Sequence, residues 1–210
     1  MGAPLTTELL PAADKGSRPL MVVLHGLGDS MEGYRWLPAA LHLPWLNYLF
    51  VNAPDAYYGG YSWYDYAGDP HPGVVRSRQL LFELLDVQRA AGFPTEQTFL
   101  FGFSQGCLMS YEIGLRYPHQ LAGLVGISGY VHEPEKLLAE RPPAAAQQRL
   151  LITHGTYDPV VPFAASREQM NQLKAGGIHI DWHEFPKDHT IAGEAELDVI
   201  REFVKRQAGH

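Results

Sequence analysis

The sequence is poor in cysteine, in basic residues and in long hydrophobic runs. One cysteine in 210 residues excludes an internal disulfide, so folding does not depend on an oxidising compartment. A formal net charge of −7 provides no basic surface for nucleic acid or for anionic membranes. No stretch approaches the roughly 18 apolar residues of a membrane-spanning helix. We therefore expect a cytoplasmic protein that has no nucleic-acid partner and no integral membrane association.

Motifs for nucleotides and metals are also missing. The Gly-Leu-Gly sequence at 26–28 follows an apolar run, but Met31 stands where a dinucleotide-binding loop needs its third glycine. There is no Walker motif, no CxxC pair and no HExxH sequence. His179, Asp181 and His183 alternate along one expected strand. An exposed polar face of that strand explains this alternation better than a metal site does. The sequence therefore predicts no cofactor and no metal.

Apolar runs typical of buried strands alternate with stretches of helical periodicity. The strand-like runs cover residues 20–24, 48–52, 98–103, 121–128, 149–153 and 179–185. Apolar residues recur at helical spacing over 74–91 and 193–207. This alternation predicts an α/β fold with a mostly parallel sheet covered by helices on both faces. A chain of 210 residues is within the size of one domain, so we expect a single domain over residues 1–210.

The most informative stretch carries one serine between two glycines. Residues 99–106 read Phe-Leu-Phe-Gly-Phe-Ser-Gln-Gly, so an apolar strand leads into Gly102, Ser104 and Gly106 at alternate positions. A strand that turns sharply into a helix leaves no room for flanking side chains and projects the serine hydroxyl into a cleft. The following residues are typical of a helix that ends before Pro118. We interpret Ser104 as a nucleophile.

A serine nucleophile needs a base, a carboxylate that orients the base, and donors for the oxyanion. Asp158 and His189 each follow an apolar run, and the order Ser, Asp, His is that of the α/β-hydrolases. Asp188 is closer to His189 in the chain, but adjacent side chains in an extended loop point in different directions. We therefore expect Ser104, Asp158 and His189 to form the catalytic triad.

Two loops are expected to supply the oxyanion donors. A glycine-rich loop follows the run at 20–24, and it can direct the backbone N–H of Leu27 at a developing negative charge. The second donor is the backbone N–H of Gln105, the residue after the nucleophile. We expect structural roles for four further side chains near these loops: His25, Asp29, Cys107 and His154.

Residues 57–66 hold five tyrosines and one tryptophan. One interpretation is an aromatic loop that packs against its own domain. We prefer the interpretation that Trp63 and Tyr64 wall a pocket for the acyl or alcohol group, since ligand sites are mostly apolar and aromatic. No insertion between residues 121 and 158 is large enough for a multi-helix cap, so we expect open access to the site.

Four blocks of the chain together resemble the carboxylesterase, lysophospholipase and acyl-protein thioesterase family of the α/β-hydrolases. They lie at residues 25–30, 102–106, 154–162 and 188–190. The resemblance implies an α/β-hydrolase fold without a large cap, and it implies no cofactor. It assigns the triad to Ser104, Asp158 and His189, and the oxyanion donors to Leu27 and Gln105. The chain departs from the family at Cys107, where many members have glycine, and at 186–188, which replaces a glycine-rich segment.

The sequence thus predicts a serine hydrolase that cleaves carboxylic esters or thioesters through an acyl-enzyme on Ser104. Lysophospholipase and acyl thioesterase activities both fit the resemblance. A serine peptidase and a non-catalytic binding protein on the same fold stay open as alternatives. A peptidase would use the same triad, but no second domain is evident that could grip a peptide. The expected partner is a small-molecule ester or thioester, and a homodimer is left open.

Overall fold

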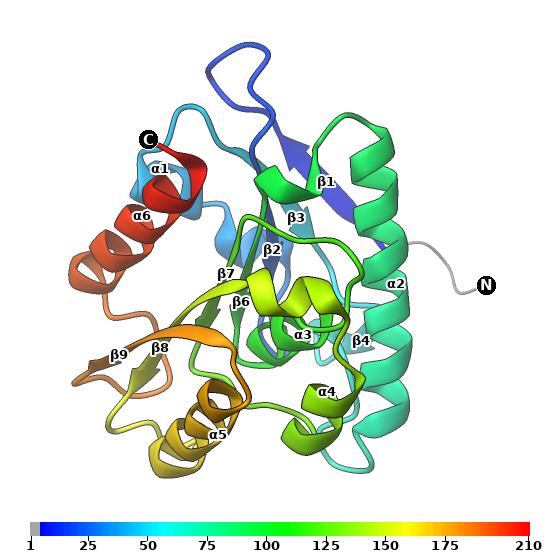
Figure 1. Cartoon of the computed structure of the whole chain (residues 1–210), viewed down its shortest axis with the longest axis vertical. Coiled ribbons are helices and arrows are strands. Elements are labelled where there is room, and N and C mark those ends of the chain that lie inside the picture. The colour runs from blue at the N-terminus through cyan, green and yellow to red at the C-terminus, as the bar shows by residue number, and fades with distance from the viewer. Residues whose placement is uncertain (1–4) are drawn as a thin grey trace.

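A seven-stranded sheet forms the centre of the computed structural model, which describes residues 5–210 (Figure 1). Its strands in spatial order are β1 (Thr7–Leu10), β3 (Asn47–Val51), β2 (Leu20–Leu24), β6 (Thr98–Phe103), β7 (Gly123–Ile127), β8 (Arg149–Gly155) and β9 (His179–Phe185). Neighbouring strands run parallel, except that β1 is antiparallel to β3. The predicted α/β fold with a mostly parallel sheet is confirmed.

The strand order reverses direction between β2 and β6. From β2 the chain moves to β3 on one side, whereas β6, β7, β8 and β9 follow one another on the other side. The last residue of β2, Leu24, pairs with Gly102 of β6, so both strands end at the same edge of the sheet. Ligands of open α/β sheets bind where neighbouring connections diverge in this way. The loops after β2 and β6 therefore begin side by side at the edge where a site is expected.

Two hydrophobic cores cover the two faces of the sheet, because successive strand side chains point to opposite faces. Val22 and Leu100 face a core that includes side chains of α2 (His71–Ala90), α3 (Gln105–Gly114), α4 (Pro134–Glu140) and α5 (Phe163–Ala175). Val23 and Phe101 face the other core, which α1 (Leu37–Leu41) and α6 (Glu194–Ala208) complete. Figure 1 shows α1 and α6 side by side on that face. Helices α2 and α6 confirm the two predicted helices.

The structure also contains elements that the sequence patterns do not indicate. Strand β1 extends the sheet at one edge, and a hairpin of β4 (Asp55–Tyr57) and β5 (Gly60–Ser62) lies within the aromatic segment. Short 3₁₀ helices are η1 (Met31–Tyr34), η2 (Thr95–Gln97) and η3 (Pro143–Gln147). Between β7 and β8 the described chain has only α4 and η3, so no multi-helix cap covers the sheet there.

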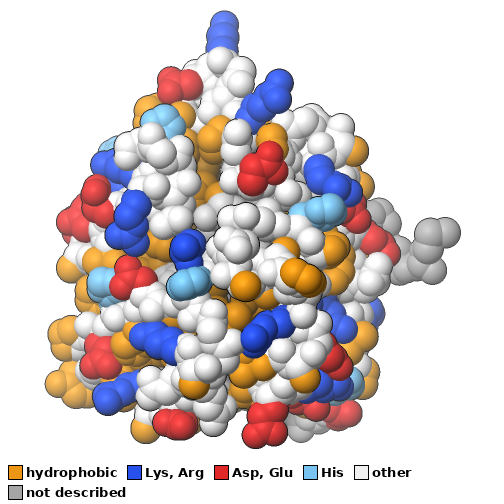
Figure 2. Space-filling view, viewed as in Figure 1, with side chains coloured by type: hydrophobic (Ala, Val, Ile, Leu, Met, Phe, Trp, Pro, Cys, Tyr) orange, Lys and Arg blue, Asp and Glu red, His pale blue; other side chains and the backbone are white. Residues whose placement is uncertain are grey.

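Charged side chains of both signs are mixed over the face of the molecule in Figure 2. Hydrophobic side chains appear there in small groups between the charged ones. Within residues 5–210, no helix is both long enough and apolar enough to cross a lipid bilayer.

Candidate active site

Ser104 lies at the turn between β6 and α3 and has a strained backbone. Its φ of 55° and ψ of −115° are unusual for a residue with a side chain, and such strain costs on the order of 1–3 kcal/mol. A Cβ on Gly102 would clash with the carbonyl oxygen of Gly106, and a Cβ on Gly106 would clash with that of Leu24. The two glycines therefore allow α3 to begin directly against β2 and β6, and the turn brings Ser104 to the wall of a cavity.

The structure brings Ser104, His189 and Asp158 into one chain of contacts. His189 Nε2 is 2.9 Å from Ser104 Oγ, and His189 Nδ1 is 2.8 Å from Asp158 Oδ2. The other carboxylate oxygen, Asp158 Oδ1, accepts hydrogen bonds of 2.9 Å from the N–H groups of Val160 and Val161. Both oxygens of Asp158 are thus engaged, and the ring of His189 lies between carboxylate and hydroxyl.

The environment of Asp158 favours its charged form. Burial by itself raises the pKa of this carboxyl, but hydrogen bonds from His189, Val161 and Val160 outweigh burial and lower the pKa below its usual value. The side chain of Asp158 is fully shielded from solvent, whereas that of His189 is 16% exposed. Asp188, the other aspartate near this histidine, is exposed. An ionised Asp158 can hold the imidazole with its Nδ1–H toward the carboxylate.

A buried ion pair anchors the loop that carries His189. Lys187 Nζ donates to Glu196 Oε1 at 2.6 Å, and the two side chains are 4% and 0% exposed. Glu196 also accepts hydrogen bonds from the hydroxyl of Thr153 and the N–H of Ala192. The sequence around residues 186–188 does not indicate this pairing, because the partner of Lys187 lies on α6, nine positions further along the chain. The pair joins the start of the histidine loop to β8 and α6.

The loop after β2 is braced by the β4–β5 hairpin. Gly28 N–H donates to the carbonyl of Tyr61 at 2.9 Å, and Tyr61 N–H donates to the carbonyl of Asp29 at 2.9 Å. A Cβ on Gly60 would clash with the carbonyl of Gly28. The two predicted oxyanion donors, Leu27 and Gln105, both line the cavity at Ser104. Within the described part of the chain, their backbone N–H groups make no hydrogen bond to other protein groups.

The cavity beside Ser104 has a volume of about 570 Å³. Beyond the residues already described, its wall includes Tyr130, which follows β7, and Gln169 on α5. Tyr130 Oη is 3.0 Å from Tyr64 Oη, so the two rings meet at the wall. No local pattern singled out Tyr130 or Gln169, although Tyr130 follows Gly129 at the end of an expected strand. Apolar side chains complete the wall, namely Val160, Val161, Pro162 and Ala165.

The prediction for Trp63 needs correction, because its side chain does not line this cavity. Trp63 is 0% exposed, and its Nε1–H donates to the carbonyl of His25 at 2.9 Å. Its backbone N–H donates to the side-chain oxygen of Gln105 at 3.0 Å, and the amide of Gln105 donates to the carbonyl of Tyr64 at 3.1 Å. Trp63 therefore packs behind the site and ties the aromatic segment to α3. Tyr64 is the member of the predicted pair that lines the cavity.

Other histidines and the single cysteine contact protein groups outside the Ser104, His189 and Asp158 contacts. The Nε2 of His25 accepts the N–H of Ala53 at 3.1 Å, and the buried ring of His154 stacks on Trp182. Burial lowers the pKa of His25 and of His154. Cys107 is fully buried, and burial raises the pKa of its thiol to about 12. On β9, His183 contacts Asp181 at the surface.

The fold and the site together define a class of protein: an α/β-hydrolase fold in which a serine, a histidine and an aspartate contact one another after three strands. The profile of the Phospholipase/Carboxylesterase family matches residues 7–208. The chain belongs to this family.

Curated relatives and solved structures agree with the family match. Acyl-protein thioesterase 1 of Schizosaccharomyces pombe is 35% identical over 169 residues, which are 73% of this chain and 74% of that protein. Carboxylesterase SOBER1 of Arabidopsis thaliana is 28% identical over 209 residues, 91% of each chain. The crystal structure of esterase PE8 has a TM-score of 0.83 and 30% identity, covering 97% of this chain and 99% of that one. The protein is thus a carboxylesterase-type hydrolase, and the peptidase and binding-protein alternatives are not favoured.

Proposed function

We propose that the protein hydrolyses carboxylic esters or thioesters with Ser104 as nucleophile, His189 as general base and Asp158 as the residue that orients the imidazole. The observation that carries this assignment is the pair of contacts on the ring of His189, 2.9 Å to Ser104 and 2.8 Å to Asp158. A base must lie within hydrogen-bond reach of both the nucleophile and its orienting carboxylate. This arrangement meets that requirement before any substrate binds.

The reaction follows from these contacts. His189 Nε2 takes the proton of Ser104 Oγ while this oxygen bonds to the acyl carbon, and the carbonyl electrons move onto the carbonyl oxygen. The N–H groups of Leu27 and Gln105 donate to that oxyanion. When the intermediate collapses, the alcohol or thiol leaves with the proton from His189. Water then adds to the acyl-enzyme by the same steps, releases the carboxylic acid and restores Ser104.

The cavity favours an uncharged acyl chain. None of the described residues that line it is a lysine or an arginine, so no cationic side chain is present there to bind an anion. An anionic phosphate close to the ester would therefore find no cationic partner, whereas an aliphatic chain could pack on Val160, Val161 and Tyr64. We propose neutral esters and acyl thioesters as substrates in preference to lysophospholipids. A volume of about 570 Å³ is within the usual range for small-molecule sites.

A fluorophosphonate probe tests the nucleophile. We expect wild-type protein to be labelled, and Ser104→Ala to lose both labelling and about 10⁶-fold in ester turnover. Ser166→Ala is the matched control, because Ser166 also lines the cavity but donates its hydroxyl to the carbonyl of Gly129 at 2.8 Å. Labelling that persists in Ser104→Ala and disappears in Ser166→Ala would contradict the proposal.

We also propose that residues 1–210 form one hydrolase domain and that it works in the cytoplasm. Two cores that share one continuous sheet support the single domain. A cytoplasmic location is compatible with the single cysteine, Cys107, because the fold does not depend on a disulfide or on an oxidising compartment. Fluorescence microscopy of the tagged protein tests the location. Sedimentation velocity tests the homodimer that the sequence leaves open.

A further inference from the structure

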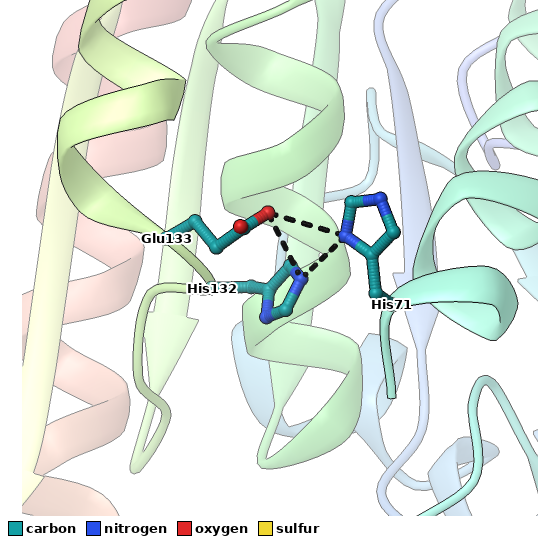
Figure 3. A group of neighbouring side chains, drawn as sticks. All are labelled: His71, His132 and Glu133. Carbon is teal, nitrogen blue, oxygen red and sulfur yellow. Dashed lines mark hydrogen bonds and ion pairs between the residues drawn. The ribbon is translucent and has the colours of Figure 1, made fainter. Parts of the chain in front are cut away.

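Three side chains of types that commonly bind metals converge at the start of α2, and none of them belongs to the group formed by Ser104, Asp158 and His189. His71 Nδ1 lies 3.1 Å from His132 Nε2 and 3.1 Å from Glu133 Oε2, and His132 Nε2 lies 3.4 Å from the same oxygen. Figure 3 shows the two rings and the carboxylate directed toward one another. His71 is the first residue of α2, and the other two residues lie in the loop that leads into α4. Segments 61 positions apart therefore bring three ligand atoms together.

Hydrogen bonds alone do not account for this triangle. The carboxylate oxygen only accepts, and each ring nitrogen either donates one hydrogen or accepts. If one ring donates, the lone pair of the other nitrogen faces the lone pairs of Glu133. If both rings donate to Glu133, their two N–H groups converge on one oxygen while the ring nitrogens lie only 3.1 Å apart. Each placement of the protons leaves either two lone pairs opposed or two N–H groups crowded at one oxygen, whereas a cation between the three atoms attracts the lone pairs of all three.

The triangle has the dimensions of one face of a zinc tetrahedron. Donors around a tetrahedral Zn²⁺ at 2.0–2.2 Å lie roughly 3.3–3.6 Å apart, a little longer than the contacts of 3.1, 3.1 and 3.4 Å. The point equidistant from the three atoms in their plane is about 1.9 Å from each, so an ion at bonding distance fits just outside the plane. Two imidazoles and a carboxylate are also a donor set that zinc accepts, with a fourth position left open.

The surroundings suit an ion that enters from solvent. His132 is 15% exposed, whereas the side chains of His71 and Glu133 are more than 40% exposed. The three residues border a cavity of about 150 Å³. Glu133 also has φ 48° and ψ 66°, a left-handed conformation that is unfavourable for a residue with a side chain. This conformation at the start of α4 holds its carboxylate beside the two rings.

One neighbouring cation competes for the carboxylate. Lys136 Nζ is 3.4 Å from the same Glu133 Oε2 and is 44% exposed, so its flexible side chain can move into solvent. Arg78 and Arg116, which also border the cavity, are already paired with Glu112 at 2.8 and 3.0 Å. Removal of Lys136 should therefore strengthen the binding of a cation at Glu133.

We propose that His71, His132 and Glu133 bind one divalent transition-metal ion, with zinc as the ion that this donor set favours, and that the ion joins α2 to the loop after β7. The joined segments carry the two tyrosines that meet at the wall of the substrate cavity. Tyr64 lies seven positions before His71, and Tyr130 lies two positions before His132. The ion would act as a structural clip behind that wall, without contact to Ser104.

Calorimetric titration of tag-free, chelator-treated protein with ZnCl₂ tests the proposal. We expect one equivalent to bind, Co²⁺ at the same site to give tetrahedral visible absorption bands, and Zn²⁺ to raise the melting temperature. His71→Ala and His132→Ala should each weaken binding about tenfold or more, and the double variant should lose it. Lys136→Met should bind more tightly than wild type. Circular dichroism confirms that each variant is folded.

His183→Ala is the matched control, because this surface histidine on β9 contacts a carboxylate, Asp181, but no second histidine. It should still bind one equivalent with wild-type affinity. Absence of one-equivalent binding by wild-type protein, or its persistence in the folded double variant, would overturn the proposal. Loss of binding in His183→Ala would move the site to β9. Weaker binding by Lys136→Met would remove Glu133 from the ligand set.

Discussion

Asp158 and Glu133 both contact histidines, but the protein surrounds the two carboxylates differently. Asp158 is shielded from solvent, and both of its oxygens accept hydrogen bonds from groups of this chain. Glu133 is exposed, and one oxygen faces two imidazoles and a lysine. At Asp158 the neighbouring donors satisfy the charge and set one direction for the His189 ring. At Glu133 the same chemical groups lie within 3.1–3.4 Å of one another without such donors, which is the basis of the proposed metal site.

A lysine lies behind each cluster, and the same contrast applies. Lys187 is buried with Glu196 at 2.6 Å, whereas Lys136 meets Glu133 at 3.4 Å in solvent. Burial lowers the pKa of Lys187, although Glu196 opposes this shift. Removal of one partner from a buried ion pair leaves the other charge buried and unpaired. The partners of an exposed pair can instead separate, because water solvates both charges. Lys187 thus stabilises the position of a loop, whereas Lys136 makes only an exposed contact with Glu133.

The largest expected effect is on ester turnover, which should depend on Asp158 but not on Glu133. Asp158→Asn should lower ester turnover about 10⁴-fold, because an amide at this position favours the wrong tautomer of His189. The variant should still bind one equivalent of zinc, since it leaves Glu133 untouched. Steady-state kinetics with one ester at one pH, combined with calorimetry, measures both.

The control for this substitution is Asp188→Asn, which removes the exposed aspartate next to His189. Its turnover should change by less than about tenfold, a small loss on the scale that triad substitutions reach. The reverse ranking of the two aspartates would contradict the assignment of Asp158 and leave Ser104 and His189 in place.

Substitutions of the two lysines should differ in their effect on the stability of the protein. Lys187→Met should lower the free energy of unfolding by about 3–5 kcal/mol, because it leaves the buried Glu196 without its cation. Lys136→Met should leave the free energy of unfolding close to that of wild type, since this pair is exposed. Urea denaturation followed by circular dichroism measures both values. Equal stabilities of the two variants would show that the Lys187 pair does not anchor the histidine loop.

A smaller, graded effect concerns the cavity beside Ser104. Ala165 on α5 lines the cavity, so Ala165→Phe should shift the preference from long to short acyl esters. Each methylene that no longer fits should cost about 1–3 kcal/mol in kcat/KM. Ala164→Phe is the control, because Ala164 is exposed on the same helix but does not line the cavity. A chain-length series of esters makes the comparison, and parallel profiles for the two variants would place the acyl chain elsewhere.

The smallest expected effect compares Ser104 with Cys107, the other nucleophilic residue near the turn between β6 and α3. Because burial raises the pKa of this thiol to about 12, folded protein should not react with an aromatic disulfide reagent at pH 8. The unfolded thiol ionises near its usual pKa of about 8.5, so the stability should fall as the pH rises above this value. The decrease from Cys107 approaches about 1.4 kcal/mol per pH unit, and it should be absent in Cys107→Ala. Rapid reaction of the folded protein would contradict the buried, protonated state.

Local patterns in the sequence determined much of the fold and many residues of the candidate site. The strand before Gly102 and the helix after Gly106 are visible as an apolar run and a helical period, and both depend on neighbours only a few positions away. The sequence also predicts the order Ser104, Asp158, His189, because each of these residues follows its own strand. The structure then brings the three side chains within hydrogen-bond distance.

Only the tertiary structure decided which of two adjacent aromatic residues faces the cavity. Trp63 and Tyr64 are equivalent in the sequence, but the hydrogen bond from Trp63 to the carbonyl of His25 turns the indole inward. The pairing of Lys187 with Glu196 and the meeting of His71 with His132 also depend on the packing of separate elements. Composition and periodicity report on the backbone around a residue. The partners that a side chain meets across the sheet are fixed only when distant segments pack together, because such contacts leave no periodic trace in the chain.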